Sequence, residues 1–189
     1  DPQSVNESTP IVSLKPRSEW PSGWDQTDIT NAMSEKLKGV EVSGQAFFDF
    51  LPGAWSGLGT TLNYTYTTGE GSQKDFYGKT MPVQDNSKHQ VNAVLWYEYD
   101  QWQARIAYNY RSERFMNRQW IDGNPSAMWS APTAYVDASV SYDINDNVTV
   151  YLQGTNLTDE DEEDVGEDGI VSARREFGPT YMVNVNYSF

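Results

Sequence analysis

The residues best suited to ligand chemistry are aromatic and arginine side chains in two long segments that lack a regular pattern, residues 68–88 and 112–134. Sugar rings present C–H faces that stack on aromatic rings, and guanidinium groups donate hydrogen bonds to hydroxyl oxygens. Packing within the segment is the alternative role for each of these side chains. The residues predicted in this way to contact a ligand are Tyr77, Phe115, Arg118, Trp120 and Trp129.

Carboxylates form a second group. Eight of the 27 acidic residues lie between residues 159 and 168. Calcium takes about six to eight oxygen ligands, and the candidate ligands in this run are Asp159, Asp161, Glu163 and Asp164. The EF-hand spacing of acids and glycine is absent, and runs of like charge are usually solvated. The sequence therefore favours a solvated loop over a metal site.

Composition argues against several other chemistries. Lys and Arg number 13 against 27 Asp and Glu, so the formal net charge is −14, which repels nucleic-acid phosphates. The chain has no cysteine and a single histidine, His89, which excludes thiolate and multi-histidine metal sites. The Gly-x-Ser-x-Gly motif of hydrolases is also absent. We predict neither an enzyme nor a bound cofactor.

Period-two alternation dominates the chain from Gly39 onward. Leu62 and Tyr64, for example, alternate with Thr61, Asn63 and Thr65, as expected of a strand with one apolar and one polar face. Seven such strands are predicted, over residues 40–50, 58–67, 90–99, 102–111, 136–144, 148–155 and 181–189.

The connections between these strands alternate between short and long. Short turns are predicted at 51–56, 100–101 and 145–147, and long loops at 68–88, 112–134 and 158–174. Short turns at one end and long loops at the other are typical of an outer-membrane β-barrel. A helical span is excluded, because the longest apolar run, residues 93–97, is far shorter than the roughly 20 residues required.

Aromatic residues on the apolar faces gather near both strand ends, with aliphatic residues between them. Two such belts match the two interfaces of a lipid bilayer. The predicted fold is therefore all-β, an antiparallel up-and-down transmembrane β-barrel. The short-turn belt contains Phe48, Phe50, Tyr97, Tyr99, Trp102, Tyr142, Tyr187 and Phe189, and the long-loop belt contains Tyr64, Tyr66, Tyr108, Tyr110 and Tyr181.

The odd strand number bears on domain organisation. Bacterial single-chain barrels have an even number of strands, and an open sheet edge is not tolerated in lipid. We therefore expect the chain to be a fragment of a larger barrel. Residues 39–189 are predicted to be its C-terminal strands, and residues 1–38 an extracellular loop or irregular remainder.

Several ordered segments carry a resemblance to a known family, namely GVEVSGQAFFDFLPG, SKHQVNAVLWYE, YNYRS, LQGTNLTDE and RREFGPTYMVNVNYSF. Their order and loop spacing resemble those of the TonB-dependent receptors of the Gram-negative outer membrane, from about Gly39 to Phe189. Within that family, YNYRSE and YDINDN are similar to the carbohydrate-type receptors of proteobacteria. FGPTYMVNV departs from that group, which often has Gly-Arg in place of Gly-Pro.

The resemblance implies a barrel of about 22 strands around a plug domain, with this chain holding the last seven strands and lacking the plug. The implied location is the bacterial cell outer membrane, and the implied function is TonB-driven uptake of a scarce nutrient, here an oligosaccharide. Implied partners are outer-membrane lipid and lipopolysaccharide, the TonB complex through the missing plug, the barrel-assembly machinery and the small-molecule nutrient. The last strand resembles the barrel-assembly signal through Val183, Val185, Tyr187 and Phe189.

Three alternatives remain open from the sequence. The first is a receptor of the same family whose nutrient is a siderophore or another compound. The second is a soluble β-sandwich carbohydrate-binding module, in which alternation also occurs. The third is a small outer-membrane enzyme or adhesin barrel, which requires an eighth strand within residues 1–38.

Overall fold

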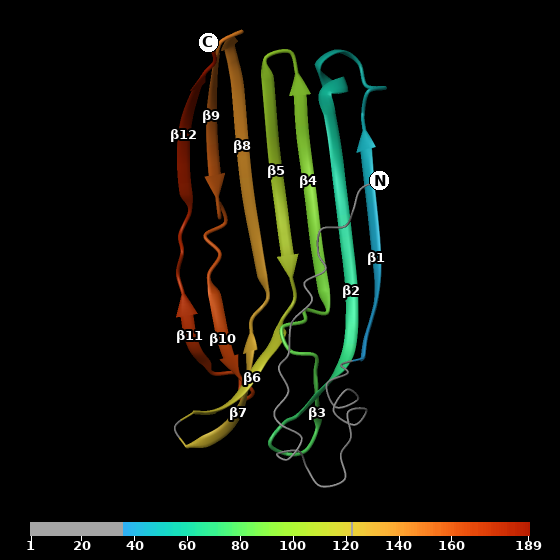
Figure 1. The fold of residues 1–189 in the computed structure, drawn as a ribbon, viewed down its shortest axis with the longest axis vertical. Coiled ribbons are helices and arrows are strands. Elements are labelled where there is room, and N and C mark those ends of the chain that lie inside the picture. Colours follow the sequence, from blue (N-terminus) through green and yellow to red (C-terminus); the bar gives the residue numbers. More distant parts are fainter. Residues whose placement is uncertain (1–35, 122) are drawn as a thin grey trace, which may run out of the picture. The chain divides into compact units, whose positions relative to one another are not determined.

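The computed structural model describes residues 36–189 except residue 122. Its main feature is a tall antiparallel sheet in which neighbouring strands follow the order β1-β2-β4-β5-β8-β9-β12 (Figure 1). The seven predicted strands are thereby confirmed. Their bounds are β1 (Lys36–Phe47), β2 (Leu58–Lys74), β4 (His89–Tyr99), β5 (Trp102–Arg111), β8 (Thr133–Asn145), β9 (Val148–Thr155) and β12 (Thr180–Tyr187).

Cross-strand register gathers the apolar residues on one face. Directly opposed residues in neighbouring strands point to the same side, and Val42, Tyr64, Val91, Tyr110 and Ala134 form one such row across five strands. Other rows of the same face include Leu62–Ala93–Tyr108–Val136 and Ala104–Val140–Leu152–Val183. The alternating residues form a separate polar face.

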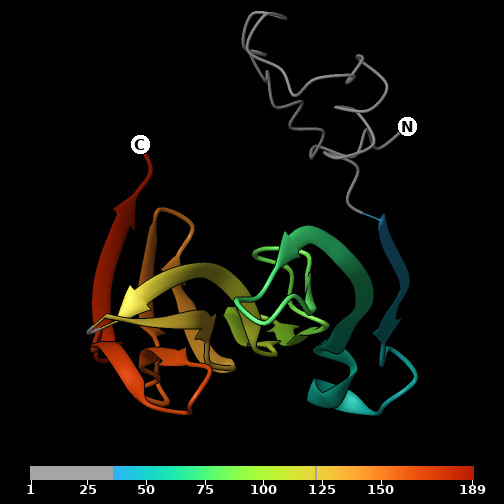
Figure 2. The same cartoon turned by 90° about the horizontal axis from the view of Figure 1, so that it is seen from below.

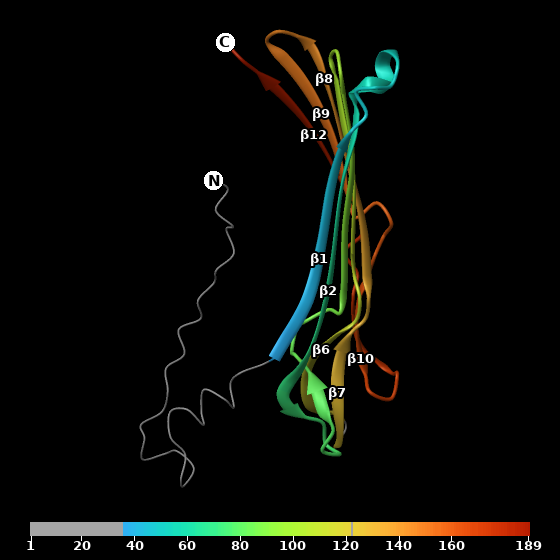
Figure 3. The same ribbon diagram turned by 90° about the vertical axis from the view of Figure 1, so that its right-hand side faces the viewer.

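The apolar face lies open. Leu62 is 51% exposed and Val183 is 69% exposed, and Figure 3 shows the sheet edge-on as a single layer along most of its height. A soluble β-sandwich would bury this face against a second sheet. The sandwich alternative is therefore wrong for this chain.

The short connections lie at one end of the sheet and the long ones at the other, as predicted (Figure 1). Between β4 and β5 the turn is Asp100–Gln101, with Asp100 at a φ of 54°. The first short connection contains the 3₁₀ helix η2 (Gly53–Gly57). Strand β1 ends at Phe47 rather than at the predicted residue 50, because the chain turns where the Leu51 N–H donates to the Phe48 carbonyl.

The long connections are not irregular loops, which corrects the sequence prediction. Strand β2 continues to Lys74, and the connections contain β3 (Thr80–Pro82), β6 (Arg114–Ile121), β7 (Asn124–Ser130), β10 (Glu162–Gly166) and β11 (Val171–Arg175). Strand β3 pairs with β2, and the other four form a second sheet in the order β11-β10-β7-β6.

The main sheet is curved but does not close, as the view from below shows (Figure 2). Strands β1 and β12 stand at the two ends of its order, and the register of the described residues does not pair them with each other. No helix in residues 36–189, residue 122 aside, combines the length and apolar character needed to cross a membrane. Residues 1–35, most of the segment expected to be an extracellular loop, lie outside the described residues.

Candidate functional site

The first two long connections share a small hydrophobic core beyond the main sheet. Phe115 of β6 is fully buried there, against Met81 of β3 and Ala127 of β7, and Trp129 packs on the same cluster. The Phe115 and Trp129 rings meet edge to face with centroids 5.7 Å apart. This contact lies within the β6–β7 hairpin, and the packing of Phe115 against Met81 joins the hairpin to the preceding connection.

A cavity of about 380 Å³ opens beside this core. It is lined by residues of all three long connections, with Trp129 as its aromatic wall and Asp75, Lys79, Glu113 and Glu167 as its charged residues. The Asp75 carboxylate is 6% exposed and accepts hydrogen bonds from the N–H groups of Tyr77 and Lys79, at 2.9 and 2.7 Å. Asp75 thus shapes the turn on which Lys79 stands.

A second aromatic group lies on the surface of the same region. The rings of Phe76 and Trp120 meet edge to face at 5.4 Å, and the Arg118 guanidinium carbon lies 5.6 Å from the Phe76 centroid. Arg118 also donates to the Lys74 carbonyl at 2.6 Å, which ties β6 to the end of β2. Trp120 is 67% exposed and Tyr77 is 83% exposed, so both rings are available to a ligand.

The predicted ligand residues therefore separate into different environments. Arg118 and Trp120 come together through Phe76, Tyr77 lies exposed beside Phe76 in the chain, and Trp129 lines the cavity. The prediction that Phe115 contacts a ligand is wrong, because its ring is fully buried and belongs to the hydrophobic core of the connections.

The acidic run forms one strand of an ion-paired hairpin rather than a free solvated loop. Arg174 lies within 4 Å of carboxylate oxygens of Asp161, Glu163 and Glu176, and Arg175 within 4 Å of those of Glu162 and Asp164. The hydrogen bonds from Arg175 lower the pKa of the Asp164 carboxyl and raise the pKa of the Arg175 guanidinium itself.

These pairs also bear on the calcium candidates. Asp161, Glu163 and Asp164 face arginines, while Asp159 occupies a turn at a φ of 53°. Within residues 36–189, leaving out residue 122, no three His, Asp or Glu side chains are grouped so as to hold a metal ion.

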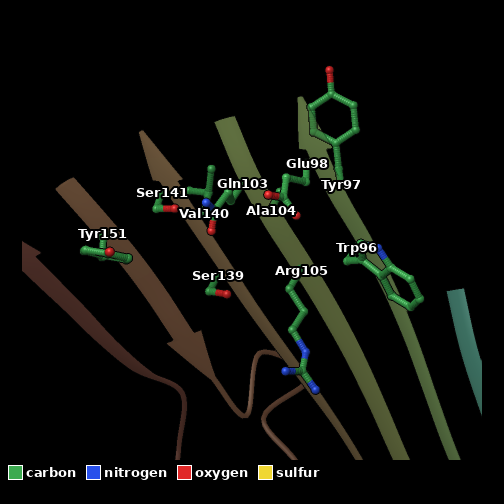
Figure 4. Close-up of a pocket in the computed structure, with 10 residues that line it drawn as sticks. All are labelled: Trp96, Tyr97, Glu98, Gln103, Ala104, Arg105, Ser139, Val140, Ser141 and Tyr151. Carbon is green, nitrogen blue, oxygen red and sulfur yellow. The ribbon is translucent and has the colours of Figure 1, made fainter. Parts of the chain in front are cut away.

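The polar face of the main sheet carries hollows of its own. One, of about 340 Å³, lies toward the short-turn end between β4, β5, β8 and β9 and includes Trp96, Arg105, Ser139 and Tyr151 (Figure 4). Sequence reasoning missed Trp96 and Tyr151 because aromatic residues were assigned to the apolar face. The alternation of the strand could have placed Trp96 on the polar face, because it lies between the apolar-face residues Leu95 and Tyr97.

Two more hollows, of about 320 and 300 Å³, lie further toward the long connections on the polar face. They share Asn92 and Asn109, whose side chains are hydrogen-bonded to each other across β4 and β5. The same cross-strand row continues through Asn63 and Tyr135. This part of the polar face is thus rich in amides, which both donate and accept hydrogen bonds.

An open antiparallel sheet with an exposed apolar face, short turns at one end and structured long connections at the other is the anatomy of an outer-membrane barrel wall. The family model of the TonB dependent receptor-like beta-barrel matches residues 4–157. The chain belongs to this family. Comparisons with curated proteins and with solved structures gave no match.

Membership of the TonB-dependent receptor family assigns the two faces. TonB-dependent receptors are outer-membrane transporters rather than enzymes, so the apolar face is the lipid-facing surface and the polar face lines the lumen. The cavity at Trp129 and the surface group at Trp120 then belong to the extracellular connections, and the hollows around Asn92 and Trp96 belong to the lumenal wall.

Proposed function

We propose that this TonB-dependent receptor takes up a scarce nutrient across the bacterial outer membrane, and that the nutrient is an oligosaccharide bound first at the extracellular connections. The observation that carries the proposal is the cavity of about 380 Å³ with Trp129 as its aromatic wall. A pyranose ring stacks on such a wall, while charged and backbone groups at the rim bond its hydroxyls.

The charges around this cavity distinguish between nutrient classes. Asp75, Glu113 and Glu167 contribute three carboxylates, against one ammonium group from Lys79. An anionic chelate such as many siderophores form would meet net repulsion there, whereas a neutral saccharide would not. The siderophore alternative is therefore the less favoured of the two.

The amide-rich lumenal wall supports the same proposal. Asn63, Asn92 and Asn109 form one row across β2, β4 and β5, and amides bind saccharide hydroxyls without requiring a charge on the solute. In the complete receptor we propose that this wall also contacts the plug, through which the TonB complex drives import.

Binding of fluorescently labelled oligosaccharides to the full-length receptor tests the proposal. Replacing Trp129 by Ala should weaken binding about tenfold, the usual order for losing one aromatic contact, and Trp120→Ala should weaken it by less because that ring is open to solvent. Trp55→Ala is the matched control, because Trp55 is 65% exposed but lies in η2 at the opposite end of the sheet. Equal affinities for Trp129→Ala and the unchanged receptor would remove the cavity from the binding site.

A further inference from the structure

A basic cluster lies on the lipid-facing surface where β1, β2 and β4 reach the extracellular side. Val40, Tyr66 and His89 form one cross-strand row of that face. Lys38 lies two residues before Val40 on the same face, opposite Thr68. Lys88 immediately precedes β4, and its ammonium nitrogen lies 5.7 Å from the centroid of the Tyr66 ring. We call Lys38, Lys88 and His89 the basic cluster.

Two tyrosines fix the position of His89. Its Nδ1 atom lies 2.8 Å from the Tyr64 hydroxyl oxygen, and the two rings stack with centroids 6.2 Å apart and planes 22° apart. The Tyr66 ring also packs against the imidazole, with its centroid 5.3 Å from that of His89. When the Tyr64 hydroxyl donates to Nδ1, the proton of the neutral imidazole is on Nε2 and can be donated to an anion.

The place of the cluster in the wall is informative. The next rows of the same face toward the short turns are uncharged, first Val42, Tyr64, Val91 and Tyr110, then Leu62, Ala93 and Tyr108. Tyr64, Tyr66 and Tyr110 belong to the long-loop aromatic belt, so the cluster stands at the level of the outer interface, where lipid headgroups lie. Lysines at this level hold their charged ends among the headgroups.

The basic cluster is positively charged, whereas the chain as a whole is negatively charged. A protein with a formal net charge of −14 places two lysines and its single histidine together on a surface that is otherwise apolar. The next acid on that face of β2 is Glu70, which lies one row beyond the Lys38–Thr68 pair and directly opposes a third lysine, Lys36. The local surface at the interface is therefore basic.

We propose that the basic cluster binds the phosphorylated headgroup of a lipopolysaccharide molecule in the outer leaflet. Each phosphate carries about −1.5 to −2 charges and three strong acceptor oxygens, which match two ammonium groups and one imidazole donor. The Tyr66 ring holds Lys88 in place by a cation–π contact, and Tyr64 holds His89. The proposal does not depend on which nutrient the receptor imports.

Native mass spectrometry of the delipidated full-length receptor tests this assignment. Its three ligands are lipid A carrying its phosphates, enzymatically dephosphorylated lipid A, and inorganic phosphate. The double variant Lys38→Gln, Lys88→Gln should bind phosphorylated lipid A about 25-fold more weakly, from about fivefold for each lysine near a membrane surface. His89→Phe keeps an aromatic ring and removes the donor, and it should weaken binding several-fold.

Lys74→Gln is the matched control, because it removes one exposed lysine from the far end of β2 and should leave binding within twofold. Undiminished binding by the double variant, or equal binding of dephosphorylated lipid A, would overturn the proposal. Inorganic phosphate binding as tightly as lipid A would also overturn it, by making the cluster an ion site. If circular dichroism shows that the double variant is misfolded, Lys88→Gln alone decides, since Lys88 is exposed and lies outside β4.

Discussion

Arg175 grips the Asp164 carboxylate with two parallel hydrogen bonds, from Nη1 to Oδ2 at 2.8 Å and from Nη2 to Oδ1 at 2.7 Å. The pair joins β11 to β10, and β10 in turn pairs with β7 through Asp164 and Ser130. A bidentate pair of this kind fixes geometry as well as charge. The outer hairpin is thereby attached to the sheet that carries the candidate ligand cavity.

Removing the guanidinium should loosen this hairpin. We expect Arg175→Gln to speed hydrogen exchange at the β10 amides of Val165 and Gly166 by up to about fivefold, a modest effect because the arginine side chain is 40% exposed and its pairs are screened by solvent. Lys79→Gln is a control for loss of one positive charge elsewhere in the connections. Unchanged exchange in Arg175→Gln would show that backbone pairing alone holds the hairpin.

Acidification should loosen the same hairpin with a predictable sign. The hydrogen bonds from Arg175 lower the pKa of Asp164 below its ordinary value of 3.8. Because the carboxyl has the lower pKa in the folded hairpin, its stabilisation is complete above the unfolded value and is lost as the pH falls below it. Protection factors of the β10 amides should therefore fall as the pH drops below 3.8 toward the lower pKa of the folded hairpin. Asp164→Asn should remove most of that pH dependence, and an identical pH profile in both proteins would contradict the assignment.

The barrel strands could be predicted from sequence because their residues face lipid and the aqueous lumen in turn, which makes apolar and polar residues alternate. Leu95 must meet lipid and Asn92 must meet the lumen, so alternation persists along β4. Strand ends lack this constraint, which is why the pattern through Phe48 and Phe50 extended beyond the true end of β1 at Phe47.

The extracellular connections could not be predicted in the same way. A register shift between Phe115 and Asn117 breaks the period of β6, and the arginine partners of the acidic run depend on how β10 and β11 align. One local signal was available, since an Asp-Gly pair ends at Gly123 between β6 and β7 and another at Gly169 between β10 and β11. Both glycines have φ near 80°, in the left-handed region.

The buried ring of Phe115 gives a test of the core beneath the ligand cavity. Phe115→Ala should cost about 3 kcal/mol, because a fully buried phenylalanine leaves an unfilled space among Met81, Ala127 and Trp129. The expected result is faster cleavage within the connections by protease added outside the cells, with the strands of the wall still protected. Trp120→Ala, at an exposed site of the same hairpin, should leave the cleavage pattern unchanged.

The close approach of Gly59 and Trp96 tests the lumenal wall. The two residues are direct cross-strand partners, and a Cβ atom at Gly59 would overlap Cε2 of the Trp96 ring. Gly59→Ala must displace that ring and should lower the free energy of unfolding by about 1–3 kcal/mol. The measurement is denaturant unfolding of the receptor refolded in detergent.

Gly44→Ala is the matched control for Gly59→Ala, because nothing lies within 4 Å of a Cβ atom at Gly44 on the neighbouring strand. Its free energy of unfolding should not fall. Equal destabilisation of the two variants would mean that backbone flexibility, and not the Trp96 ring, determines the cost.

The C-terminal residues test whether Phe189 serves assembly rather than stability. The Phe189 ring is fully exposed and touches Tyr187 edge to face at 5.0 Å, while the backbone of Ser188 is held by two hydrogen bonds of 2.8 Å to Asn147 in the β8–β9 turn. An exposed terminal ring adds little to the stability of the wall, so Phe189→Ala should refold in detergent as readily as the unchanged receptor. If Val183, Val185, Tyr187 and Phe189 form the signal that the barrel-assembly machinery recognises, the same variant should reach the outer membrane several-fold less in cells, whereas Tyr187→Phe should not. Normal amounts of Phe189→Ala in isolated outer membranes would contradict this role, and poor refolding in detergent would assign the ring to stability instead.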